Sequence, residues 1–125
     1  MNQRNTLLTA AVLGFVAVAI GAFGAHAFKP TLIATGRLDT YELAVRYQFY
    51  HTFALLAVGM LMSHFDSKKL YWASLFFFLG ILLFCGSLYV LCMTGIGVLG
   101  AVTPLGGVLF LLGWAFLLLG VAKRK

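Results

Sequence analysis

The chain has 125 residues, of which 62% are hydrophobic and 10% are charged, and its formal net charge is +6. A soluble domain is usually about half apolar and about a quarter charged, and a chain of this length lacks the interior volume to hide so much apolar surface from water. The composition therefore excludes an ordinary soluble domain. The few basic residues stand at the ends of long apolar blocks, as membrane-flanking charge does, so no nucleic-acid partner is expected.

The first apolar block covers residues 6–28 and ends in the sequence GAFGAHAFK. Ala25-His26-Ala27 has the form of a signal-peptidase site, but the apolar core of a signal peptide has only about 7–15 residues, and three more apolar blocks follow here. We therefore expect an uncleaved membrane-spanning helix, which needs about 20 apolar residues. Gly14, Gly21 and Gly24 belong to a series of small residues that indicates a face for close helix packing.

The second block, residues 41–63, is polar in its first half, YELAVRYQFYHT. Asp39-x-x-Glu42 has the form of a capping box and predicts a helix start. Ionisable or strongly polar groups within a span are costly and mark candidate sites, and this half supplies most of them: Glu42, Arg46, Tyr47, Gln48 and His51. Glu42 and Arg46 can pair along the helix. Two interpretations of these residues stay open, because they belong either to a functional site within the span or to the membrane interface, where such side chains anchor a helix.

The third block, residues 70–94, contains FCGSLYVLC, and the fourth, residues 103–122, opens with TPLGG. Cys85 and Cys92 are about 10 Å apart along a helix, too far for a disulfide. Thr103-Pro104 predicts a cap residue followed by a proline at the first helical position. These blocks add three candidate polar residues and four candidate packing residues: Ser87, Tyr89 and Thr103, and Gly86, Gly106, Gly107 and Gly113.

The four blocks predict an all-α membrane protein, a single domain that forms a four-transmembrane-helix bundle. Residues 29–40 are compatible with a re-entrant turn, an interfacial helix or a plain loop. With four spans, six basic residues share the side of the two termini: Arg4, Lys68, Lys69, Lys123, Arg124 and Lys125. Only Lys29, Arg37 and Arg46 lie on the other side. Because positive residues favour the cytoplasm, both termini are expected to be cytoplasmic.

Counting about 1.5 Å per residue along each helix places His26, Arg46, Tyr89 and Thr103 at one outer level. The candidate polar cluster near this level is either a ligand site or a set of interhelical hydrogen bonds. No metal site is predicted, since His26 and His51 differ in depth by about 10 Å. The sequence has no Gly-x-Ser-x-Gly elbow and no phosphate-binding glycine loop. We therefore expect no catalytic residue, no enzyme activity and no cofactor.

Four motifs resemble those of a known family: GAFGAHAFK, YQFYHTFAL, FCGSLYVL and VTPLGG. They are similar, in order and spacing, to the motifs of the YgdD-like inner-membrane family (domain-of-unknown-function family 423), a group that also includes the animal transmembrane-256 proteins. The resemblance implies a small four-helix protein of the bacterial inner membrane. It implies no activity and no catalytic residue.

Two functions are compatible with these features. The favoured one is a non-enzymatic membrane protein that binds or supports a lipid or another membrane protein through the polar cluster, with self-association as a further expectation. The alternative is a small oligomeric transporter or channel that uses His51, Gln48 and Arg46, since histidine can shuttle protons near neutral pH. In size the chain resembles the small multidrug resistance exporters, but its first span lacks the carboxylate on which they depend.

Overall fold

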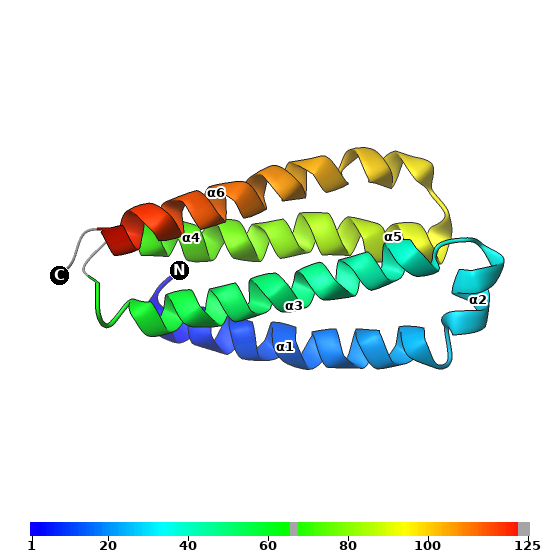
Figure 1. Cartoon of the computed structure of the whole chain (residues 1–125), viewed down its shortest axis with the longest axis horizontal. Helices are drawn as coiled ribbons and strands as arrows, with labels where there is room; N and C mark the ends of the chain where they lie inside the picture. Colours follow the sequence, from blue (N-terminus) through cyan, green and yellow to red (C-terminus); the bar gives the residue numbers. More distant parts are fainter. Residues whose placement is uncertain (66–67, 123–125) are drawn as a thin grey trace.

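The computed structural model describes residues 1–65 and 68–122, and these form helices, turns and short loops without a strand. The main helices are α1 (Gln3–Ala25), α2 (Lys29–Ala34), α3 (Leu38–Leu61), α4 (Lys68–Gly80), α5 (Gly86–Thr94) and α6 (Thr103–Ala122). A π-helical segment, η1 (Ile81–Cys85), joins α4 to α5 in one continuous rod, and a 3₁₀ segment, η2 (Gly97–Ala101), precedes α6 (Figure 1).

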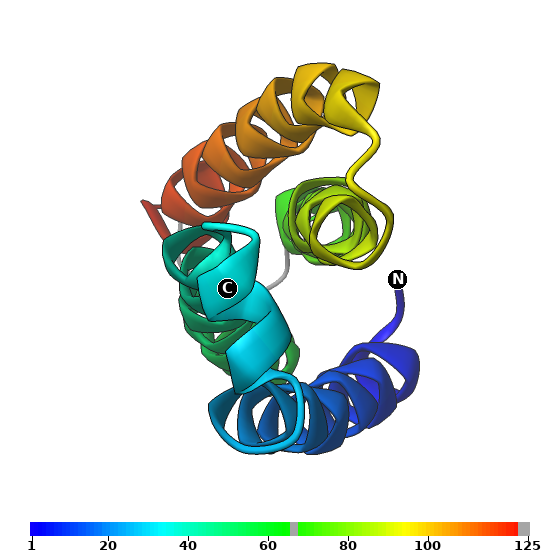
Figure 2. The ribbon, with the colours of Figure 1, turned by 90° about the vertical axis from the view of Figure 1, so that its right-hand side faces the viewer.

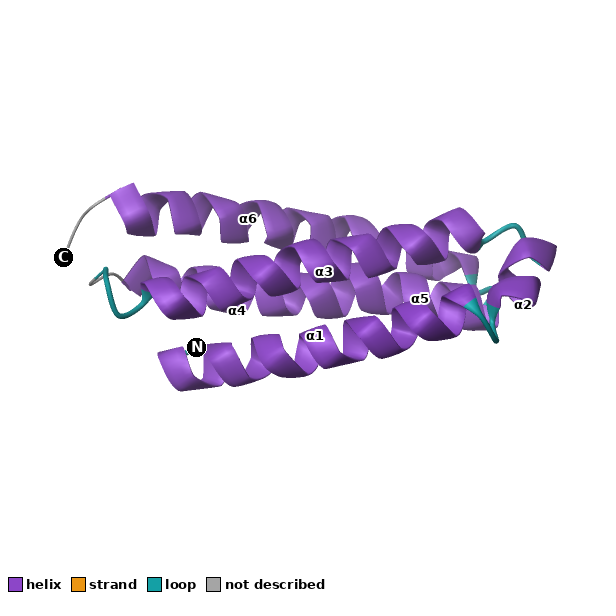
Figure 3. Cartoon of the chain, turned by 60° about the horizontal axis from the view of Figure 1, so that its bottom comes forward, coloured by secondary structure: helices purple, strands orange, loops and turns teal. Residues whose placement is uncertain are grey.

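The long helical rods lie side by side, and successive rods run in opposite directions (Figures 1 and 3). α1 begins and α6 ends at one end of the molecule, while α2 and η2 lie at the other, which we call the α2 end. The end-on view shows α1 and α6 on the outside and α3 and the α4–η1–α5 rod between them (Figure 2). The contacts agree, because α1 packs on α3, α3 on the α4–η1–α5 rod, and that rod on α6.

Among the described residues, three stretches are long and apolar enough to cross a membrane: Gln3–Ala25, Lys68–Thr94 and Gly97–Ala122. α3 has 24 residues, which also suffices for a span, but its polar first half sets it apart from these three. Large apolar side chains point outward, such as Phe15 with 78% of its surface exposed and Leu111 with 71%. Such surfaces suit a lipid environment, where the solvent around the helices is itself apolar.

Two apolar clusters hold the helices together. The larger one joins α1 through Ala10, α3, the α4–η1 part of the rod and α6, around fully buried Leu55 and Phe77. The smaller one lies at the α2 end and includes Leu32, Tyr41 and Cys92. Because Leu32 is completely buried there, residues 29–34 form a short helix docked on the bundle rather than a plain loop.

Small residues allow the rods to approach closely. A Cβ atom added to Gly24 of α1 would lie 2.7 Å from Cδ1 of Tyr41 on α3. On α6, a Cβ added to Gly106 would lie 2.7 Å from the Cα of Phe84, and one added to Gly113 would lie 2.6 Å from Cδ1 of Phe77. These glycines therefore stand where a side chain would force neighbouring helices apart.

The helix starts differ from the sequence-based predictions. α3 begins at Leu38, and its N-cap residue Arg37 makes no side-chain capping hydrogen bond, so the predicted capping box at Asp39 and Glu42 is wrong. The reason is Gly36, whose φ of 70° lets the chain turn after α2 and re-enter helical geometry at once. Asp39 lies in the first turn of α3 instead, where its charge complements the helix dipole. At the terminal end, residues 123–125, which contribute to the predicted orientation, lie outside the described residues.

Candidate functional site

Gln48 of α3 is the centre of a hydrogen-bond network that joins three rods. Its side chain is 2% exposed. Its Nε2 donates to the Leu13 carbonyl oxygen of α1 at 2.9 Å, and its Oε1 accepts from the Tyr89 hydroxyl of α5 at 2.6 Å. Cross-helix hydrogen bonds of this kind contribute on average about 0.6 kcal/mol each in membrane proteins. Gln48 and Tyr89 thus fasten α1, α3 and α5 together.

A second polar contact fastens α5 to α6. The hydroxyl oxygens of Ser87 and Thr103 lie 2.7 Å apart, and the Ser87 hydroxyl also donates to the Phe84 carbonyl oxygen at 3.0 Å. Thr103 is the first residue of α6. Because the single hydroxyl hydrogen of Ser87 is directed to Phe84, the Thr103 hydroxyl donates to Ser87 Oγ across the 2.7 Å contact, and its oxygen lies 3.4 Å from the Leu99 carbonyl oxygen. Ser87 is largely buried, with 7% of its surface exposed. This pair therefore belongs to the interior of the protein.

His51 of α3 has a partner at each ring nitrogen. The indole Nε1 of Trp114 on α6 lies 3.1 Å from His51 Nε2, and because an indole N–H can only donate, Nε2 must accept. Nδ1 then carries the hydrogen and donates to the Tyr47 carbonyl oxygen at 2.8 Å. The ring is stacked on Phe110 with centroids 3.6 Å apart. This geometry holds His51 as a neutral imidazole that bridges α3 and α6.

An aromatic groove of about 440 Å³ opens between α3 and α6 beside His51. Its lining consists largely of rings: Tyr47, Tyr50, His51, Phe84, Phe110 and Trp114. Tyr47 is stacked on Phe84 of η1, with centroids 4.8 Å apart. The groove is thus a lateral opening among packed rings.

Glu42 and Arg46 lie elsewhere, on a groove of about 240 Å³ between α1 and α3 that we call the α1–α3 groove. Its lining combines small or apolar residues with these two charged ones: Gly21, Gly24, Ala25, Tyr41, Glu42, Val45 and Arg46. The Tyr41 hydroxyl donates to the Ile20 carbonyl oxygen at 2.6 Å and so ties the two helices together beneath the groove.

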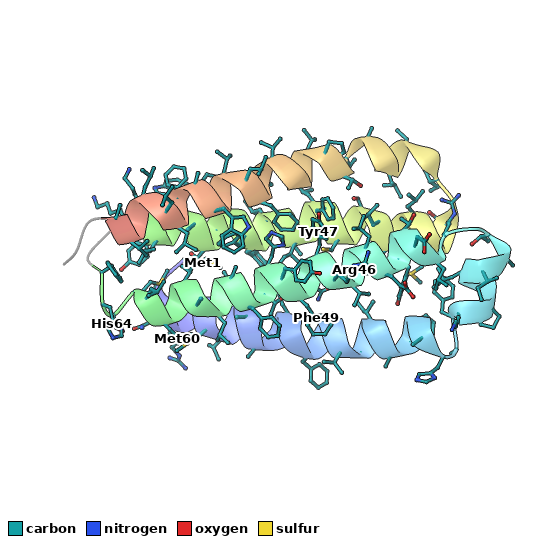
Figure 4. The ribbon with its side chains drawn as sticks, in the orientation of Figure 1. Met1, Arg46, Tyr47, Phe49, Met60 and His64 are labelled. Atoms are coloured by element: carbon teal, nitrogen blue, oxygen red, sulfur yellow. The ribbon has the colours of Figure 1, made fainter. Side chains whose placement is uncertain are left out.

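Both charged side chains on the α1–α3 groove are exposed. In residues 1–65 and 68–122, no ion pair joins Glu42 to Arg46 and no side-chain hydrogen bond engages either group. Figure 4 shows Arg46 and Tyr47 on the half of α3 nearer α2, whereas Met60 and His64 lie towards the opposite end. The two charges are therefore open to a molecule that enters the groove.

His26 follows the last residue of α1 and is exposed. In the part of the chain that the structure describes, its ring forms no hydrogen bond with Arg46, Tyr89 or Thr103. The predicted polar residues thus separate into a Gln48–Tyr89 network, a Ser87–Thr103 pair, the Tyr47–His51 aromatic groove and the two charges of the α1–α3 groove. His26 stands apart from all four.

The predicted packing glycines also differ among themselves. Gly14 and Gly21 face Thr52 and Val45 of α3, at 3.7 Å and 3.3 Å from the position of an added Cβ. Gly107 is looser, with its nearest such neighbour at 3.9 Å, and no atom lies within 4 Å of a Cβ added to Gly86. Gly86 follows η1 directly. The π-helical turn, which was not predicted, changes the rotation of the rod at this point and therefore the direction in which Gly86 points.

The residues predicted from the sequence did not include Phe49 and Phe53, which extend the face of α3 that carries Glu42 and Arg46. Glu42, Arg46, Phe49 and Phe53 follow one another at intervals of four, three and four residues, which places them along one face of α3. The rings of Phe49 and Phe53 lie 6.1 Å apart, and Phe53 is 61% exposed. The signal was present in the spacing, but both phenylalanines are ordinary residues for a membrane span.

The sequence is similar to a known family and to membrane proteins of several bacteria. The family model described as "Protein of unknown function (DUF423)" matches residues 20–107. The chain belongs to this family. It is 42% identical over 125 residues to the UPF0382 inner membrane protein YgdD of Escherichia coli (strain K12), covering 100% of this chain and 95% of the relative. It is 43% identical over 117 residues to a UPF0382 membrane protein of Staphylococcus saprophyticus, covering 94% of this chain and 96% of the relative. No solved structure matches.

These relatives confirm the family that the four motifs indicate. Their names describe inner-membrane or membrane proteins, and the part of this chain that the structure describes has three helices able to cross a membrane. It is accordingly a multi-pass protein of the inner membrane. The family description states no function, and neither relative carries an activity in its name.

Proposed function

We propose that this inner-membrane protein is a single four-span domain that binds a membrane phospholipid in the α1–α3 groove without catalysing a reaction. Both termini are in the cytoplasm, and the α2 end faces the other side. α3 is the remaining span, and its 24 residues extend about 36 Å, enough to cross a hydrocarbon core of about 30 Å. The excess of basic residues near the termini supports this orientation.

The depth of Arg46 in the membrane is the main observation that supports the proposal. Arg46 is eight residues after Leu38, the first residue of α3, and therefore about 12 Å below the start of that helix. A charged side chain at this depth needs a counter-charge or a route to the interface. Helical side chains lean towards the N-terminus of their helix, which in α3 is the α2 end, so Arg46 reaches towards the headgroup level. A lipid phosphate there supplies the counter-charge, with the bidentate geometry that guanidinium favours.

The rest of the polar cluster serves the fold in this proposal. Gln48, Tyr89, Ser87 and Thr103 have partners within the protein, and His51 is engaged at both nitrogens. A transporter that used His51 and Gln48 would have to break these contacts in each cycle. For this reason we prefer lipid binding to transport.

Phosphorus analysis tests the proposal. The protein is purified in a mild detergent, and the phospholipid retained per chain is compared between the wild type and Arg46→Gln. We expect about one tightly retained phospholipid to be lost in the variant. The control is Lys29→Gln, which removes an exposed positive charge from α2, outside the lining of the groove. Equal retention in all three proteins would refute lipid binding at Arg46.

Two further measurements separate the alternatives. A topology reporter fused after residue 125 should be active only in its cytoplasmic form, and an outward C-terminus would refute the orientation. Ion or drug flux into proteoliposomes that is abolished by His51→Ala would instead support the transport alternative. A stoichiometric protein partner, or a second copy, that occupies the α1–α3 groove in place of lipid would also contradict the proposal.

A further inference from the structure

The two charges on the α1–α3 groove are opposite in sign and one helical turn apart. Glu42 and Arg46 have the spacing at which a glutamate and a following arginine commonly pair along a helix. In the described ranges 1–65 and 68–122 they do not form an ion pair, and both side chains are exposed. The groove therefore presents a separate negative and a separate positive group to its occupant.

The order of the charges along α3 is as informative as their signs. Glu42 lies four residues from the start of α3 and Arg46 eight, so the arginine is about 6 Å deeper in the membrane. In a phospholipid, the phosphate joins the glycerol and lies closer to the acyl chains, while a headgroup amine lies farther out. An occupant with its phosphate at Arg46 therefore places a headgroup amine at the level of Glu42.

The same face of α3 continues below the charges as an apolar surface. Phe49 and Phe53 follow Arg46 on this face, and Figure 4 shows Phe49 farther than Arg46 from the α2 end. From the headgroup level towards mid-membrane, the face thus carries a carboxylate, a guanidinium and two aromatic rings. In this order, the carboxylate matches a headgroup amine, the guanidinium matches the phosphate, and the aromatic rings match an acyl chain.

We infer that the α1–α3 groove selects a zwitterionic phospholipid with a primary ammonium headgroup, of the phosphatidylethanolamine type. The inference rests on the proposed function and names its ligand. The Arg46 guanidinium holds the phosphate, and the Glu42 carboxylate accepts a charge-assisted hydrogen bond from the ammonium. A purely anionic headgroup lacks a cation for Glu42 and is repelled by it. A quaternary choline headgroup has no N–H to donate.

Competition between lipids tests the inference. Delipidated protein in detergent is mixed with equal amounts of phosphatidylethanolamine, phosphatidylglycerol and phosphatidylcholine with identical acyl chains, and bound lipid is counted by native mass spectrometry. The wild type should retain mainly phosphatidylethanolamine. In Glu42→Gln, the ratio of bound phosphatidylethanolamine to phosphatidylglycerol should fall about tenfold, the effect expected for loss of one hydrogen bond to a charged group.

The variants distinguish failure of the inference from failure of the proposed function. Arg46→Gln should lower retention of all three lipids, and Lys29→Gln should change neither the amount nor the ratio. If Arg46→Gln lowers retention but Glu42→Gln leaves the ratio unchanged, headgroup selection is refuted while lipid binding stands. If Arg46→Gln retains lipid like the wild type, both proposals fail.

Arg46→Lys provides a second test that keeps the charge. A lysine ammonium cannot reproduce the bidentate contact to phosphate, so retention should fall below that of the wild type. The ratio between phosphatidylethanolamine and phosphatidylglycerol should remain as in the wild type, because Glu42 is intact. A changed ratio in Arg46→Lys would contradict the separate roles of the two residues.

Discussion

Replacing Gly106 with alanine should destabilise the packing of α6 on the α4–η1–α5 rod. The added Cβ would lie 2.7 Å from the Cα of Phe84 and closer still to its backbone nitrogen, whereas ordinary contact begins at 3.4 Å, so the helices must separate by more than about 0.7 Å. The neighbour is backbone and cannot rotate away. Overpacking of this kind costs about 1–3 kcal/mol. The separation also stretches the 2.7 Å contact between Ser87 and Thr103, which adds about 0.6 kcal/mol when lost.

Gly107 provides a matched control on the same turn. Its added Cβ would meet nothing closer than the Phe84 Cδ2 at 3.9 Å, and an alanine in a helix interior is favoured over glycine by about 1 kcal/mol. We therefore expect Gly106→Ala to lower the sodium dodecyl sulfate concentration at the unfolding midpoint and Gly107→Ala to keep or raise it. Circular dichroism follows the transition. A Gly106→Ala variant as stable as Gly107→Ala would refute the close contact.

Three further predictions concern the interhelical hydrogen bonds. A double-mutant cycle of Gln48→Leu and Tyr89→Phe should give a coupling energy of about 0.6 kcal/mol or more in the same unfolding assay, because the two side chains bond directly; additive effects would contradict that bond. Tyr41→Phe should cost about 1 kcal/mol, because it removes the donor to the Ile20 carbonyl oxygen, and a midpoint unchanged from the wild type would count against it. Trp114→Phe should lower stability and, in ¹⁵N NMR spectra, change the signal of the His51 Nε2 atom that accepts from the indole; an unshifted signal would exclude the contact.

The sequence predicted the helical class and the small-residue faces because both depend on local patterns. Three apolar blocks correspond to helices able to cross a membrane, and Gly21 and Gly24 recur at intervals that place them on one face whatever lies opposite. The identity of the opposing surface could not be predicted in the same way. Val45 and Tyr41 meet these glycines only because α1 packs on α3 rather than on α6.

The polar cluster was predicted as a set of residues but not as a set of pairs. His51 was recognisable as an unusual group within a span, yet its partner Trp114 is 63 residues away and is an ordinary aromatic residue in the fourth apolar block. Counting along helices placed His26 at the level of Arg46, but that method treats helices as vertical and says nothing about which way a side chain faces. The exposed position of His26 depends on where α1 ends.

The π-helical segment Ile81–Cys85 restricts insertions and deletions in this part of the chain. A π-helical turn accommodates an extra residue within an otherwise α-helical rod. Removing one residue there would return the rod to regular α-helix and rotate everything after it by about 100° relative to α4. Ser87 would then turn away from Thr103, and Tyr89 from Gln48, although no residue of either pair had changed. Relatives that keep both pairs should therefore align across Ile81–Cys85 without an insertion or a deletion.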